Sequence, residues 1–128
     1  MFANCQLGGM DLGFPDVCKT PVPPVPYPNI ALGPTTIPVC FNTLLMCTPR
    51  HNLMSFRPIT QGDTPGVGLG LVSQTVMAQQ RHVTGSFTFV VKGAPHTRVT
   101  SMGPANLINC PLSYRTVPSQ FKEILLCP

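Results

Sequence analysis

The sequence predicts a mainly β domain of short strands and hairpins, joined by proline-rich loops and containing at most one short helix. Proline occurs 16 times in 128 residues, well above its typical share of about 5%. A proline inside a helix removes a hydrogen bond and clashes with the preceding turn. The apolar runs are short and bounded by turn residues, which is typical of strands in small β proteins. Because this length suits one domain, we expect a single domain over residues 1–128.

Prolines dominate the first third of the chain. Residues 21–28 read PVPPVPYP, a composition typical of an extended polyproline II segment. Residues 36–45, TIPVCFNTLL, are rich in residues that favour strands. They predict a strand with an interruption.

The rest of the chain predicts one loop, one helix and three strands. Residues 62–70, GDTPGVGLG, predict a flexible or closely packed loop, since a phosphate-binding loop would need a lysine after its last glycine. Residues 71–80, LVSQTVMAQQ, predict the one helix, of two to three turns. Residues 86–101, SFTFVVKGAPHTRVTS, predict two strands joined by a tight turn. Residues 121–126 predict a final strand.

The charge content is unusually low. Charged residues make up 9% of the chain, against roughly 25% in ordinary soluble proteins, while hydrophobic residues reach 43%. We therefore expect a partner to cover part of the surface. The apolar runs stay well short of the roughly 18 residues of a membrane-spanning helix. The net charge is +4, but the basic residues are scattered, so we expect no nucleic-acid partner.

The six cysteines give no C-x-x-C pair. The first residues, MFANC, lack the basic and continuous apolar regions of a secretory signal. We therefore expect synthesis in the cytoplasm, with cysteines that are free thiols or metal ligands rather than disulfides.

Acidic residues are scarce, which argues against catalysis. The chain has four Asp and Glu in total and none of the common hydrolase or deaminase motifs. We expect a protein that is not an enzyme. A small hydrolase built on cysteine or histidine stays open, because catalytic groups can be assembled in space from distant positions.

The three histidines and one cysteine lie near expected turns and strand ends. Three imidazoles and one thiolate would satisfy tetrahedral zinc. The candidate ligands are His51, His82, His96 and Cys110, with Cys47 as the first substitute. The alternative is that each histidine is a hydrogen-bonded turn residue and each cysteine a small buried apolar side chain.

Three stretches resemble one known family. The N-terminal MFANCQLGGMDLGFPDVCKTPVPPVPYPN resembles the start of the PAAR-like family known as Tox-PAAR-like or DUF4150. The central GSFTFVVKGAPHTRVTS resembles the PAAR hairpin, whose pattern is roughly G-S-x-x-V-x-V-x-G-K-P-A-A-R. The closing NCPLSYRTVPSQFKEILL resembles the end of that family, with its V-P-S-Q. The resemblance covers nearly the whole chain.

The resemblance implies a short cone of β-hairpins that caps the trimeric VgrG spike of a type VI secretion system or a related contractile injection machine. In such proteins the broad base docks on the spike, and the sharp apex is typically held by zinc through three histidines and one cysteine. Such caps carry or recruit effectors, cross a target membrane and leave the cell with the spike. His96 stands where the family pattern has alanine, and the segment 98–101 lacks the family's Gly-Asp.

One chain must then match a three-fold partner. The three strand clusters near residues 36–45, 86–99 and 120–126 are the candidates for a pseudo-symmetric base. Two other classes stay open: a small secreted effector enzyme, and a zinc-binding or redox module.

Overall fold

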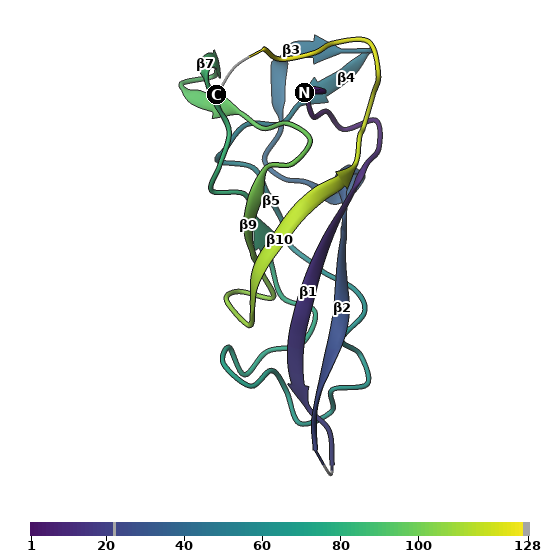
Figure 1. The fold of residues 1–128 in the computed structure, drawn as a ribbon. Coiled ribbons are helices and arrows are strands. Elements are labelled where there is room, and N and C mark those ends of the chain that lie inside the picture. The colour runs from purple at the N-terminus through teal and green to yellow at the C-terminus, as the bar shows by residue number, and fades with distance from the viewer. Residues whose placement is uncertain (22, 127–128) are drawn as a thin grey trace.

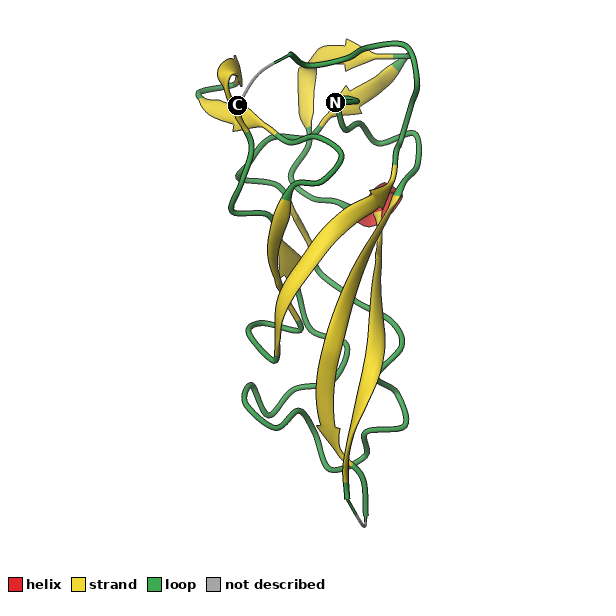
Figure 2. Cartoon of the chain, in the orientation of Figure 1, coloured by secondary structure: helices red, strands yellow, loops and turns green. Residues whose placement is uncertain are grey.

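The computed structural model describes residues 1–21 and 23–126 and shows an elongated β protein, which confirms the predicted fold class (Figures 1 and 2). The body narrows from a broad end, where the N-terminus, the last described residues and two small hairpins lie, toward the far ends of two long strands. The strands are β1 (Met10–Lys19), β2 (Pro24–Leu32), β3 (Cys40–Leu45), β4 (Thr48–Arg50), β5 (Phe56–Arg57), β6 (Gln80–Arg81), β7 (Ser86–Val91), β8 (Ala94–His96), β9 (Met102–Ala105) and β10 (Cys110–Val117). One 3₁₀ turn, η1 (Gly33–Thr35), follows β2.

Three antiparallel strand pairs form the shaft of the molecule: β1–β2, β5–β6 and β9–β10. Neighbouring pairs also join edge to edge. Strand β10 pairs with β1, and β6 lies beside β9, where Val83 N–H donates to the Met102 carbonyl at 2.8 Å. A bridge between Ile30 of β2 and Gln61, after β5, makes the third junction. The three pairs therefore enclose a narrow interior.

The proline-rich segment is a strand at the edge of the sheet, so the expectation of polyproline II is wrong for its second half. Residues 24–32 pair with β1, while Val22 lies outside the described residues. Every second residue of β2 has its N–H on the same edge, and this set contains Pro24, Pro26, Pro28 and Ile30. The Ile30 N–H points away from β1 and donates to the Gln61 carbonyl at 2.6 Å. Proline is tolerated here because the missing N–H belongs to the outer edge.

The predicted helix over residues 71–80 is also wrong. The segment forms irregular turns before β6, and Gln74 and Met77 have φ values of 54° and 55°. Several of its backbone donors bond to distant elements instead. Leu71 N–H donates to the Val17 carbonyl at 3.0 Å, and Val72 N–H donates to Asn109 Oδ1 at 2.8 Å. Tertiary contacts have replaced the local helical bonds.

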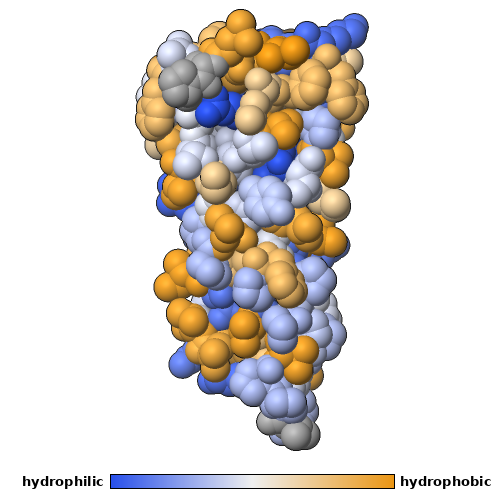
Figure 3. Space-filling view, viewed as in Figure 1, coloured by the Kyte–Doolittle hydropathy of each residue, from blue (hydrophilic) through white to orange (hydrophobic). Residues whose placement is uncertain are grey.

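The interior is polar and the surface is strongly apolar. The largest fully buried side chains include Arg57, Arg115 and all three histidines, whereas most of the large hydrophobic residues are exposed. Figure 3 shows apolar residues over much of the broad end and in patches along the shaft. No helix in the described part of the chain is long and apolar enough to cross a membrane.

The close contact between β6 and β9 requires glycine at position 103, which gives a first prediction. A Cβ there would overlap the Arg81 carbonyl oxygen. We expect Gly103→Ala to lower the free energy of unfolding by about 3 kcal/mol, because the two backbones must separate. Gly8→Ala is the control, since a Cβ at Gly8 meets no atom within 4 Å. Urea denaturation measures both; equal stability of the two variants would contradict the packing described.

Candidate functional site

Two hairpins at the broad end have the same layout, and the one formed by β7 and β8 confirms the hairpin predicted within residues 86–101. Each has a six-residue strand with buried ends and four exposed residues between them, a two-residue turn, and a three-residue return strand with proline at its centre. The registers are also the same, including an irregularity at the same place. The partners are Cys40 with Arg50, Leu44 with Pro49 and Leu45 with Thr48, then Ser86 with His96, Val90 with Pro95 and Val91 with Ala94.

The two chain termini build a third segment of this kind. Phe2 bridges to Ile124, Ala3 N–H donates to the Glu123 carbonyl at 3.1 Å, and Leu125 N–H donates to the Met1 carbonyl at 2.7 Å. The expected strand over 121–126 is therefore a single bridge within the described residues. Aligned on these partners, Phe2 corresponds to Pro49 and Pro95, and Ile124 corresponds to Leu44 and Val90.

A closed ring of backbone hydrogen bonds joins the three segments. Asn4 N–H donates to the Thr97 carbonyl at 3.1 Å, Thr97 N–H to the His51 carbonyl at 3.4 Å, and His51 N–H to the Asn4 carbonyl at 3.2 Å. A second ring repeats the pattern: Leu53 donates to Pro95, Val99 to Phe2 and Gln6 to Pro49. Each step links one segment to the next, so the broad end has pseudo-three-fold pairing. The three strand clusters predicted from sequence are the ones involved.

Equivalent positions of the three segments carry equivalent side chains. Phe41, Phe87 and Phe121 are 74%, 69% and 71% exposed, and Leu44, Val90 and Ile124 are 59%, 56% and 54% exposed. Beside them Leu45, Val91 and Leu125 are buried. We call the six exposed residues the apolar platform. An exposed apolar surface repeated three times is typical of a surface that another protein covers.

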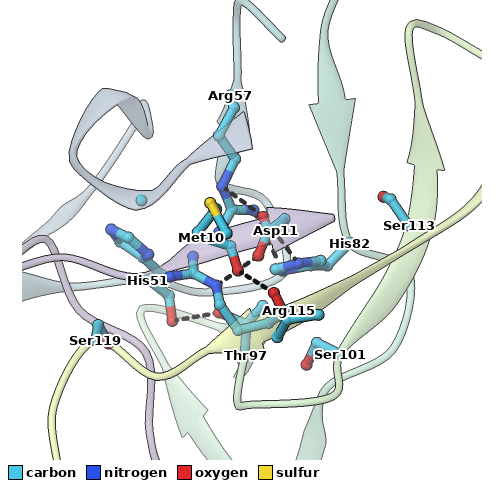
Figure 4. A network of polar contacts seen from close by, with 12 residues as sticks. Met10, Asp11, His51, Arg57, His82, Thr97, Ser101, Ser113, Arg115 and Ser119 are labelled. Carbon is cyan, nitrogen blue, oxygen red and sulfur yellow. Dashed lines mark hydrogen bonds and ion pairs between the residues drawn. The ribbon is translucent and has the colours of Figure 1, made fainter. Parts of the chain in front are cut away.

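Beneath the platform, one carboxylate gathers basic groups from three other segments (Figure 4). Asp11 of β1 lies 2.5 Å from Arg115 Nε of β10, 3.2 Å from Arg57 Nε of β5 and 3.4 Å from His82 Nε2, which follows β6. Arg57 Nη1 is 3.2 Å from His82 Nδ1. All four side chains are fully buried, so these ion pairs are the centre of the upper shaft.

Burial sets the protonation of this group. Burial would raise the pKa of Asp11, but Arg115, Arg57 and His82 outweigh it and hold that pKa far below its usual range. Burial, together with Arg57, lowers the pKa of His82 to about 4, although Asp11 opposes this. Burial lowers the pKa of Arg57 to about 10, again against Asp11. At neutral pH the network holds a carboxylate, two guanidinium groups and a neutral imidazole.

The four residues predicted as zinc ligands are buried but engaged separately. Both ring nitrogens of His82 face Arg57 and Asp11, His51 Nε2 lies 2.7 Å from Gln6 Oε1, and His96 Nδ1 lies 2.6 Å from the Thr97 carbonyl. Cys110 begins β10 on the shaft. No three of the four have ligand atoms within 4.8 Å of one another. In the geometry described here the four side chains are too far apart to bind one zinc ion together. Zinc binding by these residues stays a prediction.

A different group comes together lower in the shaft. Ligand atoms of Asp16, Cys18 and Asp63 lie within 4.8 Å of one another, all three residues are buried, and the group could hold a metal ion. Sequence reasoning missed it because Asp63 is 45 positions from Cys18, and the only local signal is the spacing Asp-x-Cys at 16–18.

The fold and the platform define a small β protein in which one chain builds a pseudo-three-fold end. The sequence model of the toxin PAAR-like domain matches residues 9–111, and the chain belongs to this family. Members of this family are PAAR-repeat or toxin-related proteins of secretion systems, associated with spike or secretion partners. No curated protein and no solved structure matches the chain.

Asp11 generates a second prediction. We expect Asp11→Asn to lower the free energy of unfolding by about 3–5 kcal/mol, because two buried guanidinium groups lose their counter-charge. Glu123→Gln is the control; Glu123 pairs with Arg50 at the broad end and its side chain is 30% exposed, so the loss there should stay below about 1 kcal/mol. Chemical denaturation measures both variants. A smaller loss for Asp11→Asn than for the control would refute the central role of Asp11.

The buried histidines generate a prediction on pH. Burial lowers the pKa of His82 and of His96 to about 4, and that of His51 well below 6.5. The unfolded chain therefore binds protons below about pH 6.5 while the folded chain stays neutral, so stability falls as pH drops from about 6.5 to 4. Above about pH 6.5, a histidine with this pKa shift contributes about 3 kcal/mol to the free energy of unfolding.

Other groups modify this pH profile. Burial and nearby Asp16 raise the pKa of Asp63, which opposes the fall, whereas the lowered pKa values of Asp11 and Glu123 extend it to more acidic pH. Thermal melts between pH 7 and 4 measure the slope, and His82→Gln should reduce it. A melting temperature that is constant over this range would contradict the neutral buried histidines.

Proposed function

We propose that this protein is a cap that seats its apolar platform on the blunt end of a trimeric spike, VgrG, in a type VI secretion or related contractile injection apparatus. The observation that carries the proposal is the pseudo-three-fold platform. A trimer ends in three equal sites around an axis, and a single chain can satisfy all three only if it repeats its contacts three times. The ring of backbone bonds and the matched phenylalanines supply this repetition.

The chemistry of the platform suits a stable protein interface. Aromatic side chains surrounded by aliphatic ones are the groups that contribute most to binding energy. Few charged groups accompany them; Arg50 is paired with Glu123 and lies 5.4 Å from the Phe89 ring centroid. These contacts join the first segment to the third and to the second, so the platform is pre-organised. Rigid surfaces lose less entropy on docking.

The proposal makes the protein a structural component rather than an enzyme. Two pockets on the described surface have volumes of about 100 and 220 Å³ and are lined mainly by apolar residues. Sites for small molecules are usually 300–1,000 Å³. The buried ionisable groups around Asp11 form ion pairs with one another inside the shaft.

The narrow end supports a role for the cap as the leading point of the spike. With the broad end docked, the ends of β1 and β2 point away from the spike and lead the assembly (Figure 1). Such a tip would meet the target membrane first during injection, and effectors would load beside it through this protein or an adaptor. The protein would be made in the cytoplasm, assembled on the apparatus and expelled with the spike.

Substitutions on the platform test the proposal. We expect Phe41→Ser, Phe87→Ser and Phe121→Ser each to weaken binding to a purified trimeric spike by about 30-fold, the effect of losing an aromatic anchor worth about 2 kcal/mol. The folded structure should survive because these rings are exposed. Isothermal titration gives the affinity, and native mass spectrometry should give one chain per trimer.

A matched control lies far from the platform. Val67→Ser removes an apolar side chain that is 78% exposed in the loop near the narrow end, and it should bind like the unaltered protein. Binding that Val67→Ser weakens as much as Phe87→Ser, or a ratio of three chains per trimer, would count against the proposed cap.

A further inference from the structure

The lower shaft contains a buried polar cluster to which all three strand pairs contribute. Asp16 and Cys18 lie on β1, Asp63 lies in the loop between β5 and β6, and Asn106 and Asn109 lie in the turn between β9 and β10. Both carboxylates and the thiol are buried, with ligand atoms within 4.8 Å of one another. The buried apolar residues described on the shaft strands are all small: Cys18, Ala31, Ala105 and Cys110.

Two asparagines hold the carboxylates in place and are themselves fixed. The Asn106 amide nitrogen donates to Asp16 Oδ2 at 3.2 Å and to Asp63 Oδ2 at 2.7 Å. Its oxygen accepts from Thr75 Oγ1 at 3.1 Å and from Ala78 N–H at 3.2 Å. The Asn109 nitrogen donates to Asp16, and its oxygen accepts from Val72 N–H at 2.8 Å. Neither carboxamide can rotate by half a turn about its last bond without losing the hydrogen bonds at its oxygen.

A third asparagine has an oxygen without a partner. Asn29 of β2 is 1% exposed, and its nitrogen donates to Asp16 Oδ2 at 2.5 Å. Its Oδ1 has no hydrogen-bond partner. The two ends of a carboxamide are nearly the same in shape, so half a turn about its last bond places the oxygen beside Asp16 Oδ2. That turn gives up the hydrogen bond from Asn29 to Asp16, and a cation bound by both oxygens would replace it.

The charge of the cluster also calls for a cation. The ion pairs among the described residues all involve Asp11 or Glu123, so two fully buried carboxylates lack a basic partner. Burial and Asp16 raise the pKa of Asp63. Burial, followed by Asp16 and Asp63, raises the pKa of Cys18 to about 12. Asparagine amides and Met77 N–H, 3.0 Å from Asp63 Oδ2, donate hydrogen bonds to these carboxylates, but no cationic side chain among the described residues neutralises their charge. A bound cation would supply that charge.

We propose that Asp16, Cys18 and Asp63, completed by Asn29 Oδ1, bind one divalent transition-metal ion of the Zn²⁺ class. Three oxygens and one sulfur give four ligands, the number that zinc prefers. The sulfur selects against Mg²⁺ and Ca²⁺, which bind through oxygen alone. As the metal–sulfur bond forms, the Cys18 proton leaves to solvent, so binding releases a proton and strengthens with pH.

The ion would join the three strand pairs in the lower shaft. Strand β1 supplies two ligands, β2 supplies one and the β5–β6 loop supplies one, while Asn106 and Asn109 bring the β9–β10 turn against the same carboxylates. A clamp of this kind replaces the apolar core that the narrow end lacks. The inference depends only on the geometry of this cluster and holds whether or not the platform docks on a spike.

Titration of the chelator-stripped protein with Zn²⁺ and Co²⁺ tests the site. We expect one ion per chain, a melting temperature that rises with added Zn²⁺, and a sulfur-to-cobalt charge-transfer band with Co²⁺. Excess Ca²⁺ or Mg²⁺ should displace neither ion. Cys18→Ser should abolish the band, and Asp63→Asn should weaken binding at least about tenfold. Two matched thiol controls, Cys47→Ser and Cys110→Ser, should keep both the band and the affinity.

X-ray absorption by the unaltered protein with Zn²⁺ gives a readout that needs no variant to fold. We expect one sulfur and otherwise oxygen neighbours, without the scattering of imidazole. Failure to bind one ion per chain, a cobalt band that survives Cys18→Ser, or imidazole neighbours together with loss of the band in Cys110→Ser would each overturn the proposal. The last result would instead assign the metal to the histidines.

Discussion

The structure depends on one buried carboxylate. Asp11 contacts Arg115, Arg57 and His82, and these come from β10, from β5 and from the residue after β6. Three strand pairs folded around a common axis leave a narrow interior, into which few large apolar side chains can pack together. The upper shaft is therefore held by directional ion pairs, which are worth their cost of burial only when every partner is present. The apolar residues, 43% of the chain, are left largely on the outside.

This arrangement fixes the broad end. Because the shaft sets the spacing of the three strand pairs, the chain leaves each pair at an equivalent place and can build an equivalent platform segment. The rings formed by Asn4, His51 and Thr97 and by their neighbours then lock the three segments to one another. The exposed phenylalanines are thus presented by rigid backbone in a repeating pattern, although the chain has no obvious sequence repeat. Shape is repeated here through hydrogen-bond register more than through residue identity.

Local sequence patterns predicted the elements whose contacts are local. The hairpin at 86–101 has its turn and its alternation within one short stretch, and the clusters at 36–45 and 120–126 carry the same apolar composition. Long-range contacts decided the rest. The strand at residues 24–32 needs β1 beside it, residues 71–80 give their donors to Val17 and Asn109, and the third platform segment joins the two ends of the chain. Sequence spacing also brought His51, His82, His96 and Cys110 into one hypothesis, whereas the fold gives each its own partners. Asp11 had no local signal, and Asp16 had only the spacing to Cys18, since a lone acidic residue in a strand usually faces water.

The two ends of the molecule are both built from β-strands but differ in where their apolar and polar side chains lie. At the broad end the apolar side chains face outward, so that free energy remains to be gained when a partner covers them. In the lower shaft the side chains of Asp16, Cys18 and Asp63 are buried, so that polar groups fill the interior there. Asp16 is central to this end as Asp11 is to the other, and both lie on β1, which, like β10, has partners on both of its edges.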